Sequence, residues 1–161
     1  MNQETANPYQ TPEASVETAS GGKLSSVFDR FSAWGVFGLL LITLGIYGLY
    51  WLYNRTQRLN QHVENPISST FITTTLVLYV IGILTNFAPL LGIAPEISLA
   101  LGLAGLVGTI MWFVWLYKLR NRIHDYLSAS KEKGNWFGPI LTFFFNVIYL
   151  QYKINQSIDS E

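Results

Sequence analysis

Four long stretches of the chain carry no charged side chain, although the chain contains ten Lys and Arg and ten Asp and Glu residues. These stretches are 31–54, 65–95, 97–117 and 134–152. A hydrocarbon layer about 30 Å thick is crossed by roughly 20 predominantly apolar helical residues, so each stretch is long enough to form one span. The pattern predicts an all-α fold, an integral membrane bundle of four transmembrane helices. The expected spans are about 33–53, 67–87, 97–117 and 135–152.

The fourth stretch is the shortest, with Pro139 early and Asn146 near its middle. A tilted or partly re-entrant segment is the alternative there, because irregular backbone is tolerated at membrane depth where other helices shield it. We favour a full span.

The expected domain organisation follows from the polar ends of the chain. Residues 1–25 are rich in Pro, Gly, Ser, Thr and Glu, a composition typical of a disordered tail. No apolar core precedes the first stretch, so we expect no cleavable signal peptide, and the first span acts as the insertion signal. The transmembrane domain is expected over 26–157, followed by a short tail at 158–161.

Small residues recur at helical spacing in the first and third stretches. Such residues let helix backbones approach closely in lipid, which favours packing seams over a ligand cleft. The residues expected in these seams are Gly35, Gly38, Gly48, Ala100, Ala104 and Gly108.

Basic residues give the expected orientation. Four spans place the 54–66 and 118–134 loops on one side with seven Lys and Arg, and both termini on the other side with three. Cytoplasmic loops carry the excess of Lys and Arg, so the two loops are predicted to be cytoplasmic and both termini outside. Lys23 and Arg30 oppose this orientation, because they lie close to the first span on its outer side.

The ends of the first and third stretches resemble each other at a constant offset of 64 residues. Trp51-Leu52-Tyr53 precedes Arg58, and Trp115-Leu116-Tyr117 precedes Arg122 in the same way. Two repeated helical hairpins would produce this pattern. Any span that ends at an aromatic belt and a basic loop would also produce it.

The segment from Leu41 to Tyr53, continuing to Arg58-Leu59-Asn60, resembles the signature of a group of small bacterial membrane proteins, domain of unknown function family 4234. The resemblance covers roughly residues 28–61. It implies helical hairpins in a multi-pass protein of the bacterial inner membrane, with no assigned reaction, ligand or catalytic residue. The positions that carry the family motif and its interfacial border are Thr43, Gly45, Tyr47, Tyr50, Trp51, Tyr53 and Arg58.

Little in the chain points to catalysis. There is no Cys, and no ionisable residue lies inside the four expected spans, where proton relays and ion paths place them. We therefore expect no enzyme, no catalytic residue and no cofactor. The net charge is zero, which gives no reason to expect nucleic acid as a partner.

Three functional hypotheses remain. The favoured one is a non-enzymatic bundle that acts through helix–helix association with itself or with a membrane-protein partner. A small pore or carrier for a neutral solute, lined by Thr75, Thr109 and Asn146, is the alternative. The third is a metal site at the cytoplasmic face, although its residues lack the spacing that places two ligands on one helix face. Its residues would be His62, Glu64, His124 and Asp125.

The lipid bilayer itself is an expected partner. Basic residues beside the spans, Arg55 and Arg58 in one loop and Lys118 and Arg122 in the other, would attract anionic headgroups. Charge that only fixes orientation is the simpler explanation of the same residues.

Overall fold

The computed structural model describes residues 21–132 and 134–161, and these residues form helices and connecting loops without a strand. The all-α prediction is therefore confirmed for this part of the chain, whereas the tail expected over 1–20 lies outside it. The helices in chain order are η1 (Leu24–Ser26), α1 (Ala33–Ile42), α2 (Ile46–Asn60), α3 (Ser69–Thr85), η2 (Ala88–Leu91), α4 (Pro95–Leu127) and α5 (Pro139–Asp159).

Helix α4 is the axis of the molecule. Its 33 residues extend roughly 50 Å, and it is the one helix of the described residues that is long and apolar enough to cross a membrane. It begins with Pro95 at its first turn and Glu96 beside it, where a fixed φ and a negative charge both favour a helix N-terminus. The expected third span, 97–117, lies wholly inside it.

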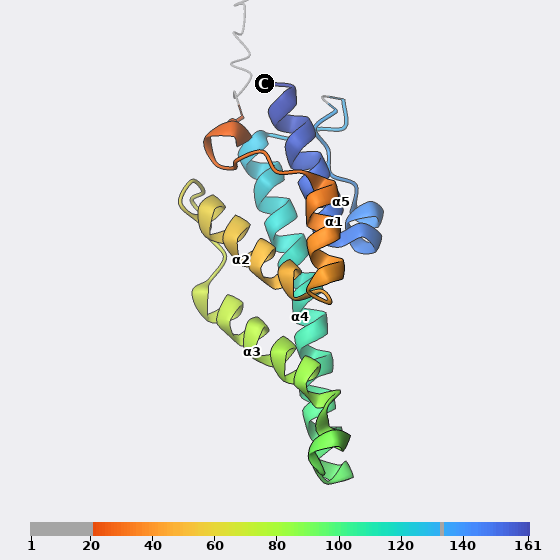
Figure 1. Ribbon diagram of the computed structural model, residues 1–161. Coiled ribbons are helices and arrows are strands. Elements are labelled where there is room, and N and C mark those ends of the chain that lie inside the picture. The colour runs from red at the N-terminus through yellow and green to blue at the C-terminus, as the bar shows by residue number, and fades with distance from the viewer. Residues whose placement is uncertain (1–20, 133) are drawn as a thin grey trace, which may run out of the picture.

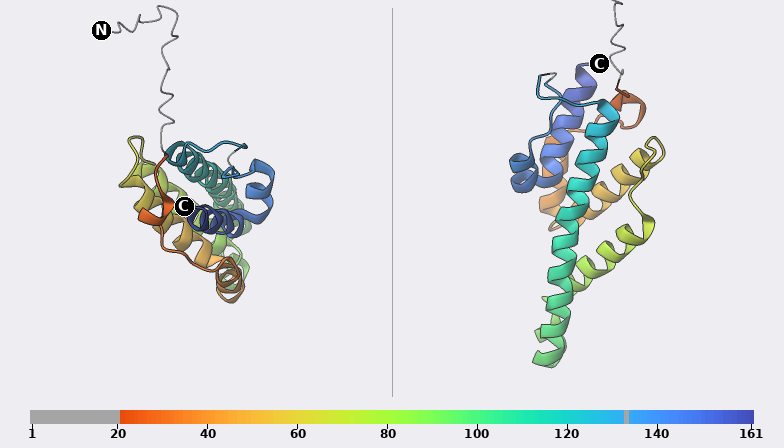
Figure 2. Two further views of the ribbon diagram at one scale, coloured as in Figure 1. Left: turned by 90° about the horizontal axis from the view of Figure 1, so that it is seen from above. Right: turned by 180° about the vertical axis from the view of Figure 1, so that it is seen from behind.

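Helices α3 and α4 form a long antiparallel hairpin that extends away from the rest of the molecule (Figure 1; Figure 2, right). Gly82, Gly105 and Gly108 make its contact. A Cβ on Gly105 would lie 2.3 Å from the Cα of Gly82, and one on Gly108 would lie 2.5 Å from the carbonyl carbon of Leu78. The two backbones thus approach as closely as glycine allows.

The expected first span, 33–53, is not one helix. Helix α1 ends at Ile42, and the chain turns back into α2 through Leu44 (φ 50°) and Gly45 (φ 90°). Thr43 stabilises the turn, since its Oγ1 donates to Leu39 O (2.7 Å) and accepts from Tyr47 N (2.9 Å). Glycine takes the left-handed conformation without a Cβ penalty. The first uncharged stretch, although long enough for one span, therefore forms a helical hairpin.

The fourth stretch is also bent. Helix α5 is interrupted at Asn146 (φ 51°, ψ −132°) and then continues seven residues past the expected end at 152. The side chain of Asn146 accepts a hydrogen bond from Trp112 Nε1 (3.1 Å). The interruption at Asn146 differs from one continuous helix over 135–152.

The two ends of the described chain lie beside the basic loops, and not at the opposite end of the molecule. Gly22 N donates to Tyr126 O (2.7 Å), and the Glu161 carboxylate accepts from Leu24 N and Ser25. Asp29 pairs with Arg58. The expected separation of the termini from the 54–66 and 118–134 loops is therefore wrong in this structure, because α1–α2 turns back and α5 is bent.

We call the end of the molecule that holds both described termini the polar body. It comprises residues 22–32, the second half of α2, α4 from Lys118, and residues 128–132 and 134–138 with the second half of α5. Its apolar core includes Leu24 and Phe28, so ordered structure begins before the expected boundary at residue 26. The opposite end, which we call the tip, is the α3–α4 connection at residues 86–94 (Figure 1).

The close glycine contact predicts opposite effects for two Gly-to-Ala changes in α4. Gly108→Ala should destabilise the protein by about 1–3 kcal/mol, because its Cβ overlaps the α3 backbone. Gly102→Ala meets no atom within 4 Å and should be neutral or stabilising by up to about 1 kcal/mol. Unfolding titrations of both variants in detergent would measure the difference, and equal effects would contradict the contact.

Candidate functional site

The centre of the polar body is the side-chain amide of Gln151. Its Oε1 accepts hydrogen bonds from Trp51 Nε1 (2.9 Å) and from Arg55 Nη2 (3.0 Å). Arg55 Nη2 also donates to Asp29 O (3.3 Å), and its guanidinium lies over the Phe28 ring (5.2 Å to the centroid). One buried amide therefore connects α5, α2 and the segment that leads into α1.

Arg55 is a buried charge without a carboxylate among its hydrogen-bond partners. It is 6% exposed, and its burial is the main reason that its pKa lies below the usual arginine value. The carboxylate of Asp29 pairs instead with Arg58, whose hydrogen bond and charge hold the pKa of Asp29 below its usual value. The positive charge of Arg55 is therefore not paired with a carboxylate.

A second set of buried polar contacts fixes α4 against the loop that follows it. Arg120 Nε donates to Phe137 O (2.7 Å), and Phe137 N donates to His124 Nε2 (2.9 Å). Lys153 Nζ donates to Gly134 O (3.0 Å). These side chains act as structural partners of backbone groups, which buried polar atoms require.

Four of the seven family-motif positions, Tyr47, Tyr50, Trp51 and Arg58, border a small cavity, which we call the motif pocket. It has a volume of about 240 Å³ and lies on one side of the Arg30–Phe31 segment. Its lining is polar and aromatic and is formed by Asp29, Arg30, Phe31, Tyr47, Tyr50, Trp51, Asn54, Arg55 and Arg58.

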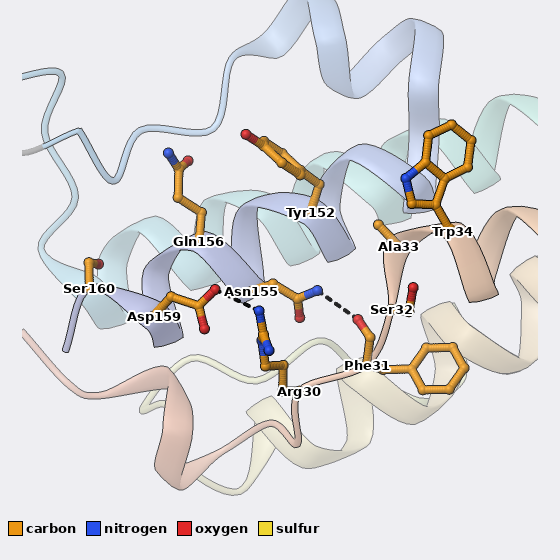
Figure 3. A pocket seen from close by; sticks show the side chains of 10 residues that line it. All are labelled: Arg30, Phe31, Ser32, Ala33, Trp34, Tyr152, Asn155, Gln156, Asp159 and Ser160. Atoms are coloured by element: carbon orange, nitrogen blue, oxygen red, sulfur yellow. Dashed lines mark hydrogen bonds and ion pairs between the residues drawn. The ribbon is translucent and has the colours of Figure 1, made fainter.

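A larger groove lies on the other side of that segment, between α1 and α5; we call it the α1–α5 groove. Figure 3 shows its polar section, about 740 Å³, where Arg30 pairs with Asp159 (2.9 Å) and Asn155 Nδ2 donates to Phe31 O (2.7 Å). Ala33, Trp34 and Tyr152 also line an adjoining cavity of about 510 Å³, which is the apolar section of the groove. The groove is therefore polar near the polar body and apolar along α1. The remaining apolar residues are Phe37, Phe145, Ile148 and Tyr149.

The structure gives the seven motif residues distinct places. Thr43 and Gly45 form the α1–α2 turn, and the rings of Tyr47 and Tyr50 lie 5.7 Å apart beside the motif pocket. Trp51 is buried in the Gln151 contact, Tyr53 is exposed on α2, and Arg58 pairs with Asp29.

Sequence reasoning missed Gln151, Asp29 and the buried position of Arg55. The sequence offered one signal for Arg55, its position four residues after Trp51, which places both side chains on one face of a helix.

The expected packing residues divide into two groups. Gly108 makes the close α3 contact, and a Cβ on Gly48 would lie 3.2 Å from Leu40 and 3.5 Å from Trp112. The atoms nearest to a Cβ on Gly35 would be those of Phe31 and Ser32 in the preceding turn. Of the other three, Gly38 has open space where a Cβ would lie, Ala100 is exposed and Ala104 is half-buried. Gly82, the partner of Gly105, was not among the expected residues.

The 64-residue similarity is confined to the second half of each element. Trp51 and Trp115 are both buried, and each indole N–H donates to a side-chain oxygen, of Gln151 and Thr56 respectively. Upstream the elements differ, because the chain turns at Gly45 whereas α4 is continuous.

The three residues expected to line a pore make hydrogen bonds within the fold. Thr75 and Thr109 donate to the carbonyls of Phe71 and Gly105 in their own helices, as Asn146 accepts from Trp112.

The four residues of the metal hypothesis are not brought together. His62, Glu64 and Asp125 border one cavity, but His124 Nε2 is bonded to Phe137 N. Over residues 21–132 and 134–161, no three His, Asp or Glu side chains are grouped to hold a metal ion.

Fold and site together define an all-helical protein whose central helix can cross a membrane and whose polar side chains are joined in structural contacts. The family model described as Domain of unknown function (DUF4234) matches residues 31–125, more than half of the chain. The chain belongs to this family, as the α1–α2 motif indicated. No curated protein and no solved structure matches the chain.

The Gln151 contact predicts a large loss of stability for Gln151→Leu. The substitution keeps the side-chain size but removes the oxygen that accepts from Trp51 Nε1 and Arg55 Nη2, which should cost about 2–4 kcal/mol of unfolding free energy. Gln61→Leu, at the exposed end of α2, is the matched control and should change stability by less than about 0.5 kcal/mol. Unfolding titrations in detergent measure both, and a loss for Gln151→Leu as small as that of the control would refute this role.

Proposed function

We propose that the protein is a non-enzymatic protein of the bacterial inner membrane that acts through helix–helix association at the membrane surface. The α3–α4 hairpin is its deep anchor, and the α1–α2 turn and the first half of α5 enter the layer only from one side. The polar body lies at the cytoplasmic face. Two helices thus cross or nearly cross the layer, where the sequence alone predicted four.

The distribution of basic residues is the observation that carries this proposal. Residues 59–117 contain no Lys or Arg, so the tip and the whole of α3 lack positive charge. The described basic residues belong to the polar body and its border: Lys23, Arg30, Arg55, Arg58, Lys118, Arg120, Arg122, Lys131 and Lys153. The positive-inside rule then favours a cytoplasmic polar body, and Lys23 and Arg30 no longer oppose it.

Exposed apolar side chains support this arrangement of a deep hairpin and shallow elements. The hairpin exposes apolar residues along its length, among them Leu84, Leu103 and Ile110, and the tip exposes Leu90 and Leu91. A soluble protein rarely exposes so extended an apolar surface.

The shallow elements expose apolar residues at a different level. Leu44 in the α1–α2 turn is 91% exposed, and Phe143 of α5 stacks on Phe113 of α4 (5.0 Å). Phe113 is 18 residues beyond Pro95, about 27 Å along α4. The shallow elements therefore meet α4 near one boundary of a layer about 30 Å thick.

The polar contacts support a non-enzymatic role. Arg120, His124 and Lys153 each hold backbone groups of the fold, and such side chains would have to leave these partners to act on a substrate.

The apolar section of the α1–α5 groove is the surface we propose for association. Trp34 is 81% exposed there, next to Phe37 and Phe145, at the level of the shallow elements. Helices pack in lipid through shape and close contact, and this groove offers an open apolar concavity between two helices. Its occupant would be a helix of a second copy or of a membrane-protein partner.

The test is the oligomeric state of the purified protein in mild detergent and in native-membrane pull-downs. We expect a homo-oligomer or one stoichiometric partner, lost in Trp34→Ala because the groove loses its most exposed ring. Leu90→Ala, an equally exposed residue at the tip, should leave association unchanged. A protein that is monomeric and without a partner in both experiments would contradict this function.

A further inference from the structure

The motif pocket contains more positive than negative charge. Three arginines are among the residues that line it, Arg30, Arg55 and Arg58, against the single acidic residue Asp29. Arg30 pairs with Asp159 in the neighbouring groove, and Arg58 pairs with Asp29. The charge left without a carboxylate is that of Arg55.

Arg55 is held in a position from which it can still donate. Both of its hydrogen bonds, to Gln151 and to Asp29 O, come from Nη2. Among the described residues, the one buried side-chain nitrogen or oxygen without a partner is Ser157 Oγ, so Nε and Nη1 of Arg55 are not sealed from solvent. The guanidinium is therefore preorganised by its Nη2 bonds, and Arg55 is one of the residues that line the cavity.

The remaining lining suits a phosphate group at a membrane surface. Tyr47 and Tyr50 add hydroxyl groups, and Tyr50 is 60% exposed on the side of the α1–α2 turn. Amphipathic aromatic rings prefer the headgroup level of a bilayer. Arginine binds phosphate through charge-assisted and often bidentate hydrogen bonds, which lysine does not reproduce.

We propose that the motif pocket binds the phosphate of an anionic phospholipid. Arg55 and Arg58 bind its oxygens, and Tyr50 lies beside its glycerol region. Arg58 exchanges the Asp29 carboxylate for the phosphate when lipid binds, so Asp29 competes with the ligand. The proposal rests on the proposed membrane location, and it gives the family motif a ligand of defined chemistry.

Competition by Asp29 distinguishes a binding site from a structural ion pair. Asp29→Asn removes the competing charge and keeps the shape, so lipid affinity should rise severalfold even if stability falls slightly. Arg55→Gln should weaken lipid binding by about tenfold, as loss of a hydrogen bond between charged groups would. Arg58→Gln should also weaken it, which keeps the test decisive if Arg55→Gln does not fold.

Arg122→Gln is the matched control. It removes one positive charge from the polar body, where Arg122 Nε donates to Asn65 O outside the motif pocket. General attraction between a basic surface and anionic lipid would be lowered equally by all three Arg variants. A specific site requires that Arg122→Gln bind like the unchanged protein.

The measurement is native mass spectrometry of the full chain, with phosphatidylglycerol or phosphatidylcholine added to mild detergent. We expect retention of phosphatidylglycerol over phosphatidylcholine, weakened by Arg55→Gln and strengthened by Asp29→Asn. Equal retention of both lipids, or equal losses in all three Arg variants, would overturn the proposal.

Two further measurements distinguish lipid phosphate from free phosphate, and the lipid site from the proposed function. If inorganic phosphate displaces the lipid at equal concentration, the pocket takes free phosphate and the lipid assignment is wrong; if it does not, the lipid assignment is supported. Flotation with lipid vesicles tests membrane location independently. A protein that floats without headgroup preference refutes only the lipid site, whereas one that does not float refutes the proposed function as well.

Discussion

The buried amide of Gln151 is the contact on which the arrangement of the molecule depends. A single carbonyl oxygen accepts from Trp51 and Arg55, and Arg55 in turn holds the backbone of Asp29. These bonds join helix α5, helix α2 and the segment before α1, three parts of the chain far apart in sequence. A buried donor left without an acceptor costs more than the bond itself contributes, so the contact fixes one arrangement against alternatives.

That arrangement differs from the one that the uncharged stretches predicted. Length and composition predicted four crossings, because both report only that a segment tolerates an apolar environment. They carry no information on whether the segment turns back. Thr43, with Gly45 in the left-handed conformation, reverses the first stretch, and Asn146 bends the last. The all-helical class and the long apolar helix over the third stretch were predictable from periodicity and length, whereas the two reversals depend on local backbone conformations.

The site was predictable in part. The family motif at residues 43–58 correctly indicated the family, and its residues form the turn, the Gln151 contact and the lining of one pocket. Gln151 and Asp29 could not be found from spacing, because their partners lie 100 and 29 residues away. The sequence indicated that small residues would pack helices together. Which of them meet depends on the rotation of α3 against α4, and Gly82 and Gly105 determine that rotation.

The central claim is that Asp29 and Arg58 lie on the same side of the membrane, in one polar body. The chain has no Cys, so Asp29→Cys and Arg58→Cys together introduce its only two thiols. A short bifunctional thiol reagent applied to native membranes should join them within one chain, because the two side chains are in contact. Absence of this cross-link, with both thiols labelled singly and from opposite sides of the membrane, would contradict the account.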